Sequence, residues 1–334
     1  MKQRILLLVL LFVITANPQL SFSQVIRVES IGITVRDMNR SLPFFTEVLG
    51  FKKVSDAEFH GEETERLYGL FGIHTRVVRL QLGEEFIDLT DFLTPGGRDI
   101  PGDQKSNDLI FQHIAIVVSD MDKAYERLRK YHVEHVSTVP QTLPVTIPEA
   151  AGIKAFYFHD PDNHNLELIW FPKGKGQEKW QRRNGKIFMG IDHTAIGISI
   201  TGDSHRFYSD LLGFDRKGES WNKGMEQSHL NNVEMASLHI TGYRAKAGPG
   251  VEFLQYVNPG PGKLYPADSR PDDIWHWQTT LVVNDLRRLS KKLEEMKVPF
   301  VSKGIVQSKN SSTLQLIIRD GDGHALLLKG SGDE

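Results

Sequence analysis

Four short stretches rich in β-branched and apolar residues recur along the chain, and each is typical of a β-strand. They are Ser30–Asp37, His113–Asp120, His193–Ile200 and Gln278–Asp285, and their first residues are 83, 80 and 85 positions apart. A spacing this regular indicates internal repeats rather than four unrelated strands. The pattern therefore predicts four copies of one structural unit, which we call modules 1 to 4.

A predicted helix follows each of these strands, and the helices are of two kinds. Those of modules 1 and 3, Ser41–Phe51 and Ser204–Phe214, end in Leu-Gly-Phe, where the glycine suits a helix C-terminus. Those of modules 2 and 4, Asp122–Lys130 and Leu286–Met296, are amphipathic. Because the two kinds alternate, the chain is predicted to be a duplication of a two-module unit. Three of the four strands end in an aspartate that can cap the next helix: Asp37, Asp120 and Asp285.

Modules 2 and 4 each contain a turn that precedes a short apolar strand. The turns are Asp160–Asn165 and Asp320–His324, and their Asp, Asn, Gly and Pro residues favour reverse turns. Because turns generally lie at the surface, we expect His164 and His324 to be exposed.

Segments rich in Gly, Pro and charge separate the modules. Thr94–Asn107 and Asn258–Asp273 lie inside the two halves of the chain, and 173–187 separates the halves. We interpret the Lys and Arg residues of that linker as a solvated surface. Module 3 also carries the long segment Asp215–Val233, which we interpret as an insertion that forms a lid or a pocket wall.

The first residues predict a secretory signal peptide. A positively charged start and the apolar run Ile5–Ile14 are followed by small residues at Ser21 and Ser23. The apolar run is too short to span a bilayer comfortably. We therefore expect residues 1–23 to be removed and the protein to be periplasmic or secreted, without stable membrane insertion after cleavage. An uncleaved membrane anchor is the alternative.

Composition narrows the function classes further. The chain of 334 residues has a formal net charge of −2, which provides no basic field for nucleic acid. It contains no cysteine, which excludes disulfides, a thiol nucleophile and a lipid-modified cysteine. Its hydrophobic content of 40% and charged content of 25% are typical of a soluble globular protein.

The strand, the Leu-Gly-Phe helix, the Asp-Pro-Asp-Asn turn and a last strand that bears a glutamate together resemble the vicinal-oxygen-chelate superfamily. This group includes glyoxalase I, extradiol dioxygenases and bleomycin-resistance proteins. The resemblance implies an α+β fold in which four βαβββ modules pair into two half-open β-cups. We place the halves at 24–172 and 188–334. The four modules are expected at 27–92, 110–171, 188–257 and 275–329.

The resemblance also implies where metal ligands lie: at the first residue of the opening strand and in the last strand of a module. Modules 2 and 3 offer His113 with Glu167 and His193 with Glu252. A glutamate inside an apolar strand is costly unless it is paired, solvated or bound to metal, which supports this assignment. We therefore expect these four residues to hold one divalent metal ion. Modules 1 and 4 offer a poorer set: Ser30, Asp88, Gln278 and Leu327.

Two ways of pairing the modules remain open. If neighbours pair, 1 with 2 and 3 with 4, the chain contains two incomplete ligand sets. If pairing crosses between the halves, modules 2 and 3 form one complete set, and modules 1 and 4 form a cup that has lost its ligands. We favour crossed pairing, because pairing of neighbours would require two separate partial losses.

Imidazole and carboxylate ligands suit iron, manganese, nickel, cobalt or zinc, and we take Fe(II) as the first choice. Glu167 and Glu252 are candidate catalytic residues, because one of them could act as a general base. His239 is a third candidate if it faces the cup, and a hydrogen-bonded structural histidine if it does not. Tyr157 could donate to a substrate oxygen or belong to the core.

The expected partner is a small molecule that chelates the metal through adjacent oxygens. The expected reaction is that of a lyase or isomerase, or of an Fe(II) dioxygenase. The alternative is a metal-free binding protein like the bleomycin-resistance proteins. No nucleic-acid partner is expected, and the chain can act as a monomer or a homodimer.

Overall fold

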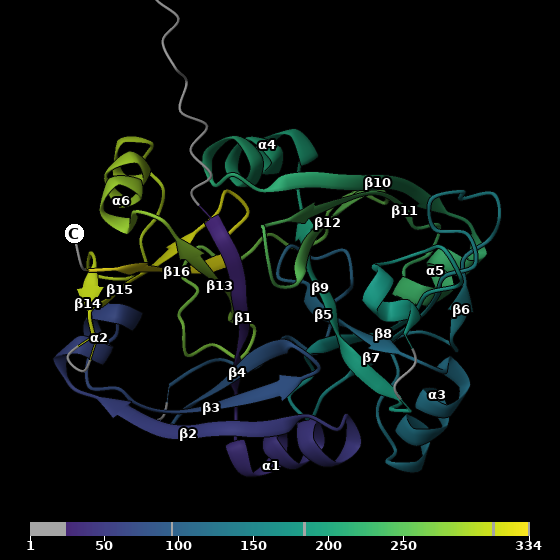
Figure 1. Ribbon diagram of the computed structural model, residues 1–334, viewed down its shortest axis with the longest axis horizontal. Coiled ribbons are helices and arrows are strands. Elements are labelled where there is room, and N and C mark those ends of the chain that lie inside the picture. The colour runs from purple at the N-terminus through teal and green to yellow at the C-terminus, as the bar shows by residue number, and fades with distance from the viewer. Residues whose placement is uncertain (1–24, 95, 183–184, 309–310, 333–334) are drawn as a thin grey trace, which may run out of the picture.

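Two eight-stranded sheets lie side by side in the computed structural model, which describes residues 25–94, 96–182, 185–308 and 311–332 (Figure 1). The predicted signal peptide lies outside these residues. No helix within the described ranges is long and apolar enough to cross a membrane.

The first sheet combines modules 1 and 4, in the strand order β14-β15-β16-β13-β1-β4-β3-β2. Module 1 supplies β1 (Val25–Val35), β2 (Lys52–His60), β3 (His74–Leu82) and β4 (Glu85–Phe92). Module 4 supplies β13 (Trp277–Val283), β14 (Val306–Gln307), β15 (Thr313–Arg319) and β16 (Ala325–Ser331). We call the concave side of this sheet the 1–4 cup.

The second sheet combines modules 2 and 3, in the order β10-β11-β12-β9-β5-β8-β7-β6. Module 2 supplies β5 (Gln112–Val118), β6 (Gln141–Thr142), β7 (Lys154–His159) and β8 (Asn165–Trp170). Module 3 supplies β9 (Phe188–Ile198), β10 (Asp215–Lys223), β11 (Ser237–Arg244) and β12 (Gly250–Asn258). We call its concave side the 2–3 cup. The predicted α+β fold of paired modules is confirmed, and so is crossed pairing.

The opening strands of two modules meet at the centre of each sheet. In the 2–3 cup β5 runs antiparallel to β9, with His113 opposite Ala195 and Ala115 opposite His193. In the 1–4 cup β1 runs antiparallel to β13 in the same manner, with Ser30 opposite Thr280. The two cups therefore have equivalent registers, so each inward position of one cup has a counterpart in the other.

Four helices follow the opening strands as predicted: α1 (Met38–Pro43), α3 (Met121–Lys130), α4 (Thr201–His205) and α6 (Leu286–Glu295). Two further helices, α2 (Glu62–Tyr68) and α5 (Met225–Asn231), follow the edge strands β2 and β10. A π-helical turn extends α1 over Phe44–Val48 and α4 over Arg206–Leu211, and a short 3-10 helix covers Glu178–Gln181.

Three of these helices begin at the predicted aspartate caps. The side chain of Asp37 accepts a hydrogen bond from the amide of Asn39, Asp120 from that of Lys123, and Asp285 from that of Arg288. Such caps satisfy amide groups that have no partner within the helix. The Leu-Gly-Phe segments end their helices at Gly50 and Gly213, which both have positive φ angles.

The main hydrophobic core draws on both sheets and on the helices that cover them. It includes Ile31, Ile116, Ile196 and Leu281 from the four opening strands, all of them buried. In Figure 1 α4 and α6 lie above the sheets and α1 and α3 below them. The residues of this core pack outward against helices, so the inward side chains of each strand, which are both polar and apolar, line the concave faces.

The turn histidines are buried, so the expectation that they are exposed was wrong. His164 Nδ1 lies 2.8 Å from Asp160 Oδ2, and His164 Nε2 lies 2.6 Å from the carbonyl oxygen of Ile274 beside the other sheet. His324 Nε2 lies 2.7 Å from the carbonyl oxygen of Gly197, again across to the other sheet. These turns are buried because they join the two sheets.

The prediction that Asp215–Val233 is an insertion was wrong, because module 1 contains an equivalent segment. Both modules contain an edge strand followed by a seven-residue helix, β10 and α5 in module 3 and β2 and α2 in module 1. Each helix begins after a glycine of positive φ, Gly224 or Gly61. The segment does form a pocket wall, because Ser220, Asn222 and Gln227 line the cavity of the 2–3 cup.

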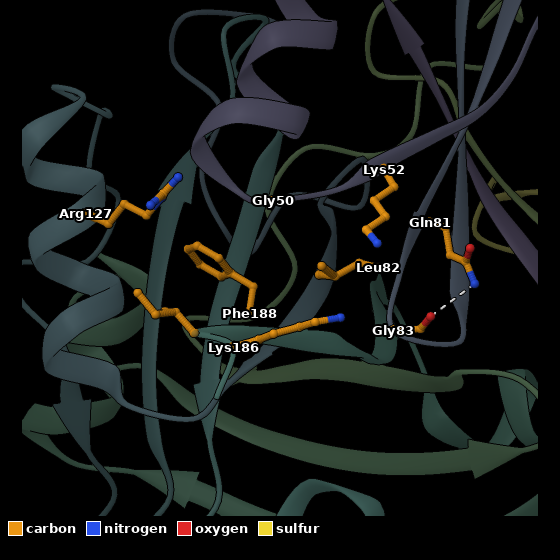
Figure 2. Close-up of a pocket in the computed structure, with 9 residues that line it drawn as sticks. Gly50, Lys52, Gln81, Leu82, Gly83, Arg127, Lys186 and Phe188 are labelled. Carbon is orange, nitrogen blue, oxygen red and sulfur yellow. Dashed lines mark hydrogen bonds between the residues drawn. The ribbon is translucent and has the colours of Figure 1, made fainter. Parts of the chain in front are cut away.

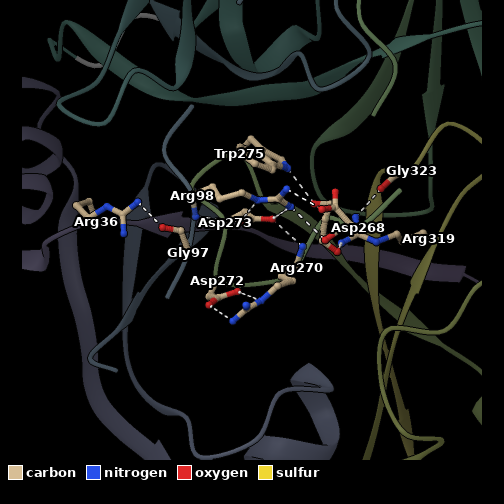
Figure 3. Close-up of polar contacts among 11 residues, drawn as sticks. Arg36, Gly97, Arg98, Asp268, Arg270, Asp272, Asp273, Trp275, Arg319 and Gly323 are labelled. Carbon is tan, nitrogen blue, oxygen red and sulfur yellow. Dashed lines mark hydrogen bonds and ion pairs between the residues drawn. The ribbon is translucent and has the colours of Figure 1, made fainter. Parts of the chain in front are cut away.

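The connectors inside the two halves pack against each other. Arg98 donates from Nη2 to Asp273 at 2.8 Å and from Nη1 to Asp268 at 2.9 Å, and its guanidinium lies over the ring of Trp275 (Figure 3). Gly97 lies so close to the backbone of Asp272 that a Cβ atom there would overlap its carbonyl oxygen. Contacts between the connectors therefore tie the two halves of the chain together.

Candidate metal centre

Four strands bring the expected ligands to the concave face of the 2–3 cup. His113 lies on β5 and His193 on β9, the two central strands. Glu167 lies on β8 beside β5, in register with Ala115, and Glu252 lies on β12 beside β9, in register with Ala195. Because side chains of a strand alternate between faces, these registers place all four side chains on one face.

The four side chains converge. Ligand atoms of His113, Glu167 and His193 all lie within 4.8 Å of one another. Glu167 Oε2 lies 3.1 Å from His113 Nε2 and 3.7 Å from His193 Nε2. Glu252 Oε2 lies 3.5 Å from His193 Nε2. Within the described part of the chain, no other group of three such residues meets this geometry.

The donor set fits a divalent metal ion. The Nε2 atoms of His113 and His193 are buried, and although Glu167 Oε2 lies 3.1 and 3.7 Å from them, neither makes a well-oriented hydrogen bond to a described residue. A buried polar atom without a partner is costly, and a metal bound by the imidazole nitrogens would remove that cost. Two imidazoles with carboxylates form a ligand set that suits first-row transition metals and zinc.

Asp192, which the sequence analysis did not single out, orients one of the imidazoles. Its Oδ2 lies 3.1 Å from His193 Nδ1 and accepts a hydrogen bond from Arg244 at 2.8 Å. Its Oδ1 accepts from the indole of Trp180 at 2.6 Å and from Gln177 at 3.0 Å. Since a carboxylate only accepts, His193 Nδ1 carries a proton, which leaves Nε2 as the nitrogen that can bind a metal.

Burial and the clustered charges change the acidity of these groups. Burial lowers the pKa of His113, and the nearby Glu167 only partly offsets this. Burial also works to lower the pKa of His193, but Glu252, Asp192 and Glu167 outweigh it and raise the pKa to about 9. Burial raises the pKa of Glu252. The metal-free cluster therefore favours a second proton on the His193 ring, at Nε2, which a bound cation would displace.

Three of the four expected ligands, Glu167, His193 and Glu252, line a cavity of about 340 Å³ in the 2–3 cup, whereas His113 is buried and does not line it. Its walls combine apolar side chains such as Leu143 and Ile240 with polar ones such as Asn222 and Gln227. The side chain of Glu252 is 29% exposed, whereas that of Glu167 is 7% exposed, so Glu252 is the carboxylate more open to a bound molecule. A volume of this size suits a small organic molecule.

Two of the other candidates differ in their access to this cavity. Tyr157 lines it, with its ring centroid 4.9 Å from that of His113. His239 does not line it: its ring stacks on Trp221, and its nitrogens lie 3.2 Å from Thr201 Oγ1 and 3.0 Å from Glu219 Oε2. The structure therefore gives His239 the surroundings of a structural histidine rather than of a catalytic one.

A separate concavity of about 340 Å³ is lined by residues of modules 1, 2 and 3, including Lys52, Arg127, Lys186 and Phe188 (Figure 2). Arg127 is held there by hydrogen bonds to the carbonyl oxygens of residues 47 and 48. No imidazole or carboxylate lines this concavity. It therefore offers neither metal ligands nor a general base.

The 1–4 cup has a different arrangement at the equivalent positions. Ser30 donates to Asp88 Oδ2 at 2.6 Å, and Arg79 donates from Nε and Nη2 to the same carboxylate at 2.7 and 2.9 Å. Gln278 and Leu327 occupy the other two positions and line the same cavity. A guanidinium paired with Asp88 thus lies in the 1–4 cup where the 2–3 cup gathers metal ligands.

Comparison with known proteins defines the class. A sequence profile of the Glyoxalase/Bleomycin resistance protein/Dioxygenase superfamily matches residues 27–168 and 190–328. The chain belongs to this superfamily, as the sequence patterns predicted.

Two individual proteins match part of this chain in sequence. A 2-epi-5-epi-valiolone epimerase from Actinomyces sp. is 32% identical over 156 residues, which is 45% of this chain and 81% of that protein. The uncharacterized protein YwbC from Bacillus subtilis is 25% identical over 143 residues, 43% of this chain and 96% of that protein. Both matches cover less than half of this chain, as expected if each relative corresponds to two of the four modules.

Among solved structures, glyoxalase I from Zea mays superposes with a TM-score of 0.61 at 16% identity. The superposition covers 91% of this chain and 92% of the maize protein. At this identity the likeness shows a shared fold over nearly the whole chain and does not transfer the reaction.

Proposed function

We propose that this protein is a metal-dependent enzyme that moves a proton on a carbon atom next to a carbonyl group in a small polyoxygenated molecule. Such a reaction would make it an isomerase, an epimerase or a lyase. The observation that carries the proposal is the convergence of His113, Glu167 and His193 within 4.8 Å, with Glu252 beside them in a cavity of about 340 Å³.

His113, Glu167 and His193 would hold the metal, and Glu252 would complete the set or remain available to substrate. When bound, the metal supplies a Lewis acid that polarises a carbonyl oxygen. The donor atoms are compatible with iron, manganese, nickel, cobalt or zinc. Asp192 fixes the orientation and tautomer of His193 through the contact with Nδ1.

Glu252 is the residue that we assign to proton transfer. It is the more exposed of the two glutamates, and it lies beside the ligand cluster rather than between the two imidazoles. Its carboxylate would take the proton from the substrate carbon and return it, while negative charge develops on the carbonyl oxygen. Tyr157, on the cavity wall, would donate a hydrogen bond to a substrate oxygen.

The relative that is an epimerase by name suggests the first substrates to test. Its name indicates a cyclic polyhydroxy ketone, a molecule with adjacent oxygen atoms and an acidic C–H bond. We therefore propose small hydroxylated cyclic ketones as the substrate class.

Exchange of substrate protons with solvent tests the proposal directly. Hydroxylated cyclohexanones would be incubated in D₂O with the metal-loaded protein, and deuterium uptake next to the carbonyl would be followed by NMR. We expect exchange with the wild type and a loss of about 100-fold or more with Glu252→Gln, because a general base typically contributes that much. Asp88→Asn, at the equivalent position of the 1–4 cup, is the matched control and should keep the exchange. Equal rates in the wild type and Glu252→Gln would contradict the proposal.

An Fe(II) oxygenase is the second candidate. Two histidines and one carboxylate form the ligand type that is typical of such enzymes, and His113, His193 and Glu167 provide it. The two candidates differ in metal and cosubstrate. An oxygenase would consume O₂ only with iron, whereas proton transfer would persist without O₂ and with zinc or nickel.

We also propose that the protein acts outside the cytoplasm after removal of residues 1–23. The support is the positively charged start, the apolar run and the small residues of the sequence. N-terminal sequencing of the protein from cell fractions tests this. A mature protein that begins at Gln24 in the periplasm or medium is expected, and an intact Met1 in the cytoplasm would contradict it.

A further inference from the structure

The 1–4 cup retains a cavity although it lacks the metal ligands. The cavity has a volume of about 380 Å³, close to the 340 Å³ of the cavity in the 2–3 cup. Residues of strands from modules 1 and 4 and of the helix α2 line it, and Figure 1 shows where these elements lie. A concave site of this size, with apolar walls and a few convergent polar groups, is the usual form of a binding site for a small molecule.

The floor of this cavity carries no net charge. Arg79 is paired with Asp88, and Lys329 donates to Glu29 at 2.7 Å behind it. The charged residues that line the cavity are two cations, Arg79 and Lys329, and two carboxylates, Glu63 and Asp88, so an ionic ligand would gain little Coulombic attraction there. The guanidinium of Arg79 donates to Asp88 from Nε and Nη2, and it also lines the cavity. An oxygen atom of an uncharged ligand could accept from this group.

The walls combine apolar surface with small polar side chains. Tyr68, Val77 and Leu327 provide an apolar side, and Thr75 and Thr90 line the cavity between them. Small inward side chains keep the cup open: Ala57 on β2 is one of them. The walls therefore suit a flat or cyclic apolar skeleton, and the floor suits its oxygen atoms.

We propose that the 1–4 cup is a second, metal-free binding site that takes a small uncharged ring compound bearing hydroxyl or carbonyl oxygens. In the 1–4 cup, Arg79 is a fixed hydrogen-bond donor that contacts an oxygen atom of the ligand. In the 2–3 cup, the ligand cluster would provide the equivalent contact to substrate oxygen. The site does not depend on the reaction proposed for the 2–3 cup, because the two cavities share no lining residue.

Saturation-transfer NMR on the full chain tests this inference, with phenol, catechol and 4-hydroxyacetophenone as probes. Two matched variants distinguish the cups. Ala57→Trp places a large ring in the 1–4 cup, and Ser220→Trp does so at the equivalent position of the 2–3 cup. Both positions lie on an edge strand, and Ala57 is exposed, so neither substitution disturbs the core.

We expect at least one probe to bind the wild type saturably and to bind Ala57→Trp at least about tenfold more weakly, a loss of about 1.4 kcal/mol. Ser220→Trp should retain that binding. The inference is overturned if none of the three probes binds, if Ala57→Trp leaves binding unchanged, or if Ser220→Trp abolishes it.

Discussion

The two cups share strand order and register, yet only one of them gathers metal ligands. In the 2–3 cup, Gly242 of β11 lies opposite Glu252, and a Cβ atom at Gly242 would meet nothing within 4 Å. In the 1–4 cup, Arg79 of β3 lies opposite Asp88 at the equivalent position and binds its carboxylate. The residue opposite the carboxylate therefore adds to the loss of the histidines: Asp88 faces an internal cation, whereas Glu252 faces open space.

The comparison also shows what the sheet itself contributes. The register, the edge strand and the short helix on the rim are the same in both cups. The difference lies in side chains that point into the cup, so function can be gained or lost there without disturbing the core.

The largest effect is expected from the loss of an imidazole. His193→Ala should abolish stoichiometric metal binding, with a loss of affinity above about 100-fold, because even outer-shell changes cost about 10–100-fold. Titration with Zn²⁺ followed by calorimetry would measure it. Ser30→Ala, the counterpart in the 1–4 cup, should bind metal like the wild type. Equal losses of metal affinity in both variants would contradict the claim that only the 2–3 cup binds metal.

Gly242→Arg should convert the 2–3 cup toward the state of the 1–4 cup. The new guanidinium would pair with Glu252 and repel a cation, and we expect metal affinity to fall by about 100-fold. Gly242→Ala is the control, since its Cβ has open space and adds no charge. If Gly242→Arg binds metal as tightly as Gly242→Ala, the side chain opposite the carboxylate does not contribute to the difference.

A smaller loss is expected from Asp192→Asn. The neutral amide would be a weaker acceptor for the proton of His193 Nδ1 than the carboxylate is. Metal affinity should therefore fall by about tenfold. Glu29→Gln changes the residue that precedes Ser30 in the 1–4 cup and should leave metal affinity unchanged. The same titration reports both variants, and an unaltered affinity in Asp192→Asn would show that Asp192 does not orient the ligand.

The smallest effect concerns stability and the turns that join the sheets. Burial works to lower the pKa of His164, but Asp160 and Asp162 raise it above the ordinary value of 6.5. The protonated ring therefore stabilises the fold fully below about pH 6.5, and this contribution is lost as the pH rises through the raised value.

We expect the free energy of unfolding to fall by about 1 kcal/mol over that range, the size of one hydrogen bond. Urea unfolding of the metal-free protein at several pH values would measure it. His164→Gln should remove this component of the pH dependence, whereas His324→Gln in the equivalent turn should retain it. A pH dependence identical in the wild type and His164→Gln would contradict the assignment.

Much of the fold could be predicted because it is repeated in the sequence. Four similar strands at nearly equal intervals indicated the modules, and the loss of His and Glu from modules 1 and 4 together indicated crossed pairing. Repetition also singled out His113, Glu167, His193 and Glu252, which the structure brings together.

The remaining features depend on contacts between segments far apart in the chain. The burial of His164 arises from Ile274, 110 positions away, and no local pattern reveals it. The matching roles of Gly242 and Arg79 become visible only when strand register is known. Asp192 stood next to a predicted ligand, so its position was a signal that sequence reasoning could have used.

The metal content of the purified full chain tests the central claim most directly. Inductively coupled plasma mass spectrometry on protein prepared with and without O₂ would count the ions per chain. We expect about one transition-metal or zinc ion per chain, because only the 2–3 cup provides a ligand set among the described residues. We also expect near-complete loss of the metal in a His113→Ala/Glu252→Ala variant that remains folded. No bound metal in the folded wild type, or an ion that persists in this variant, would contradict it.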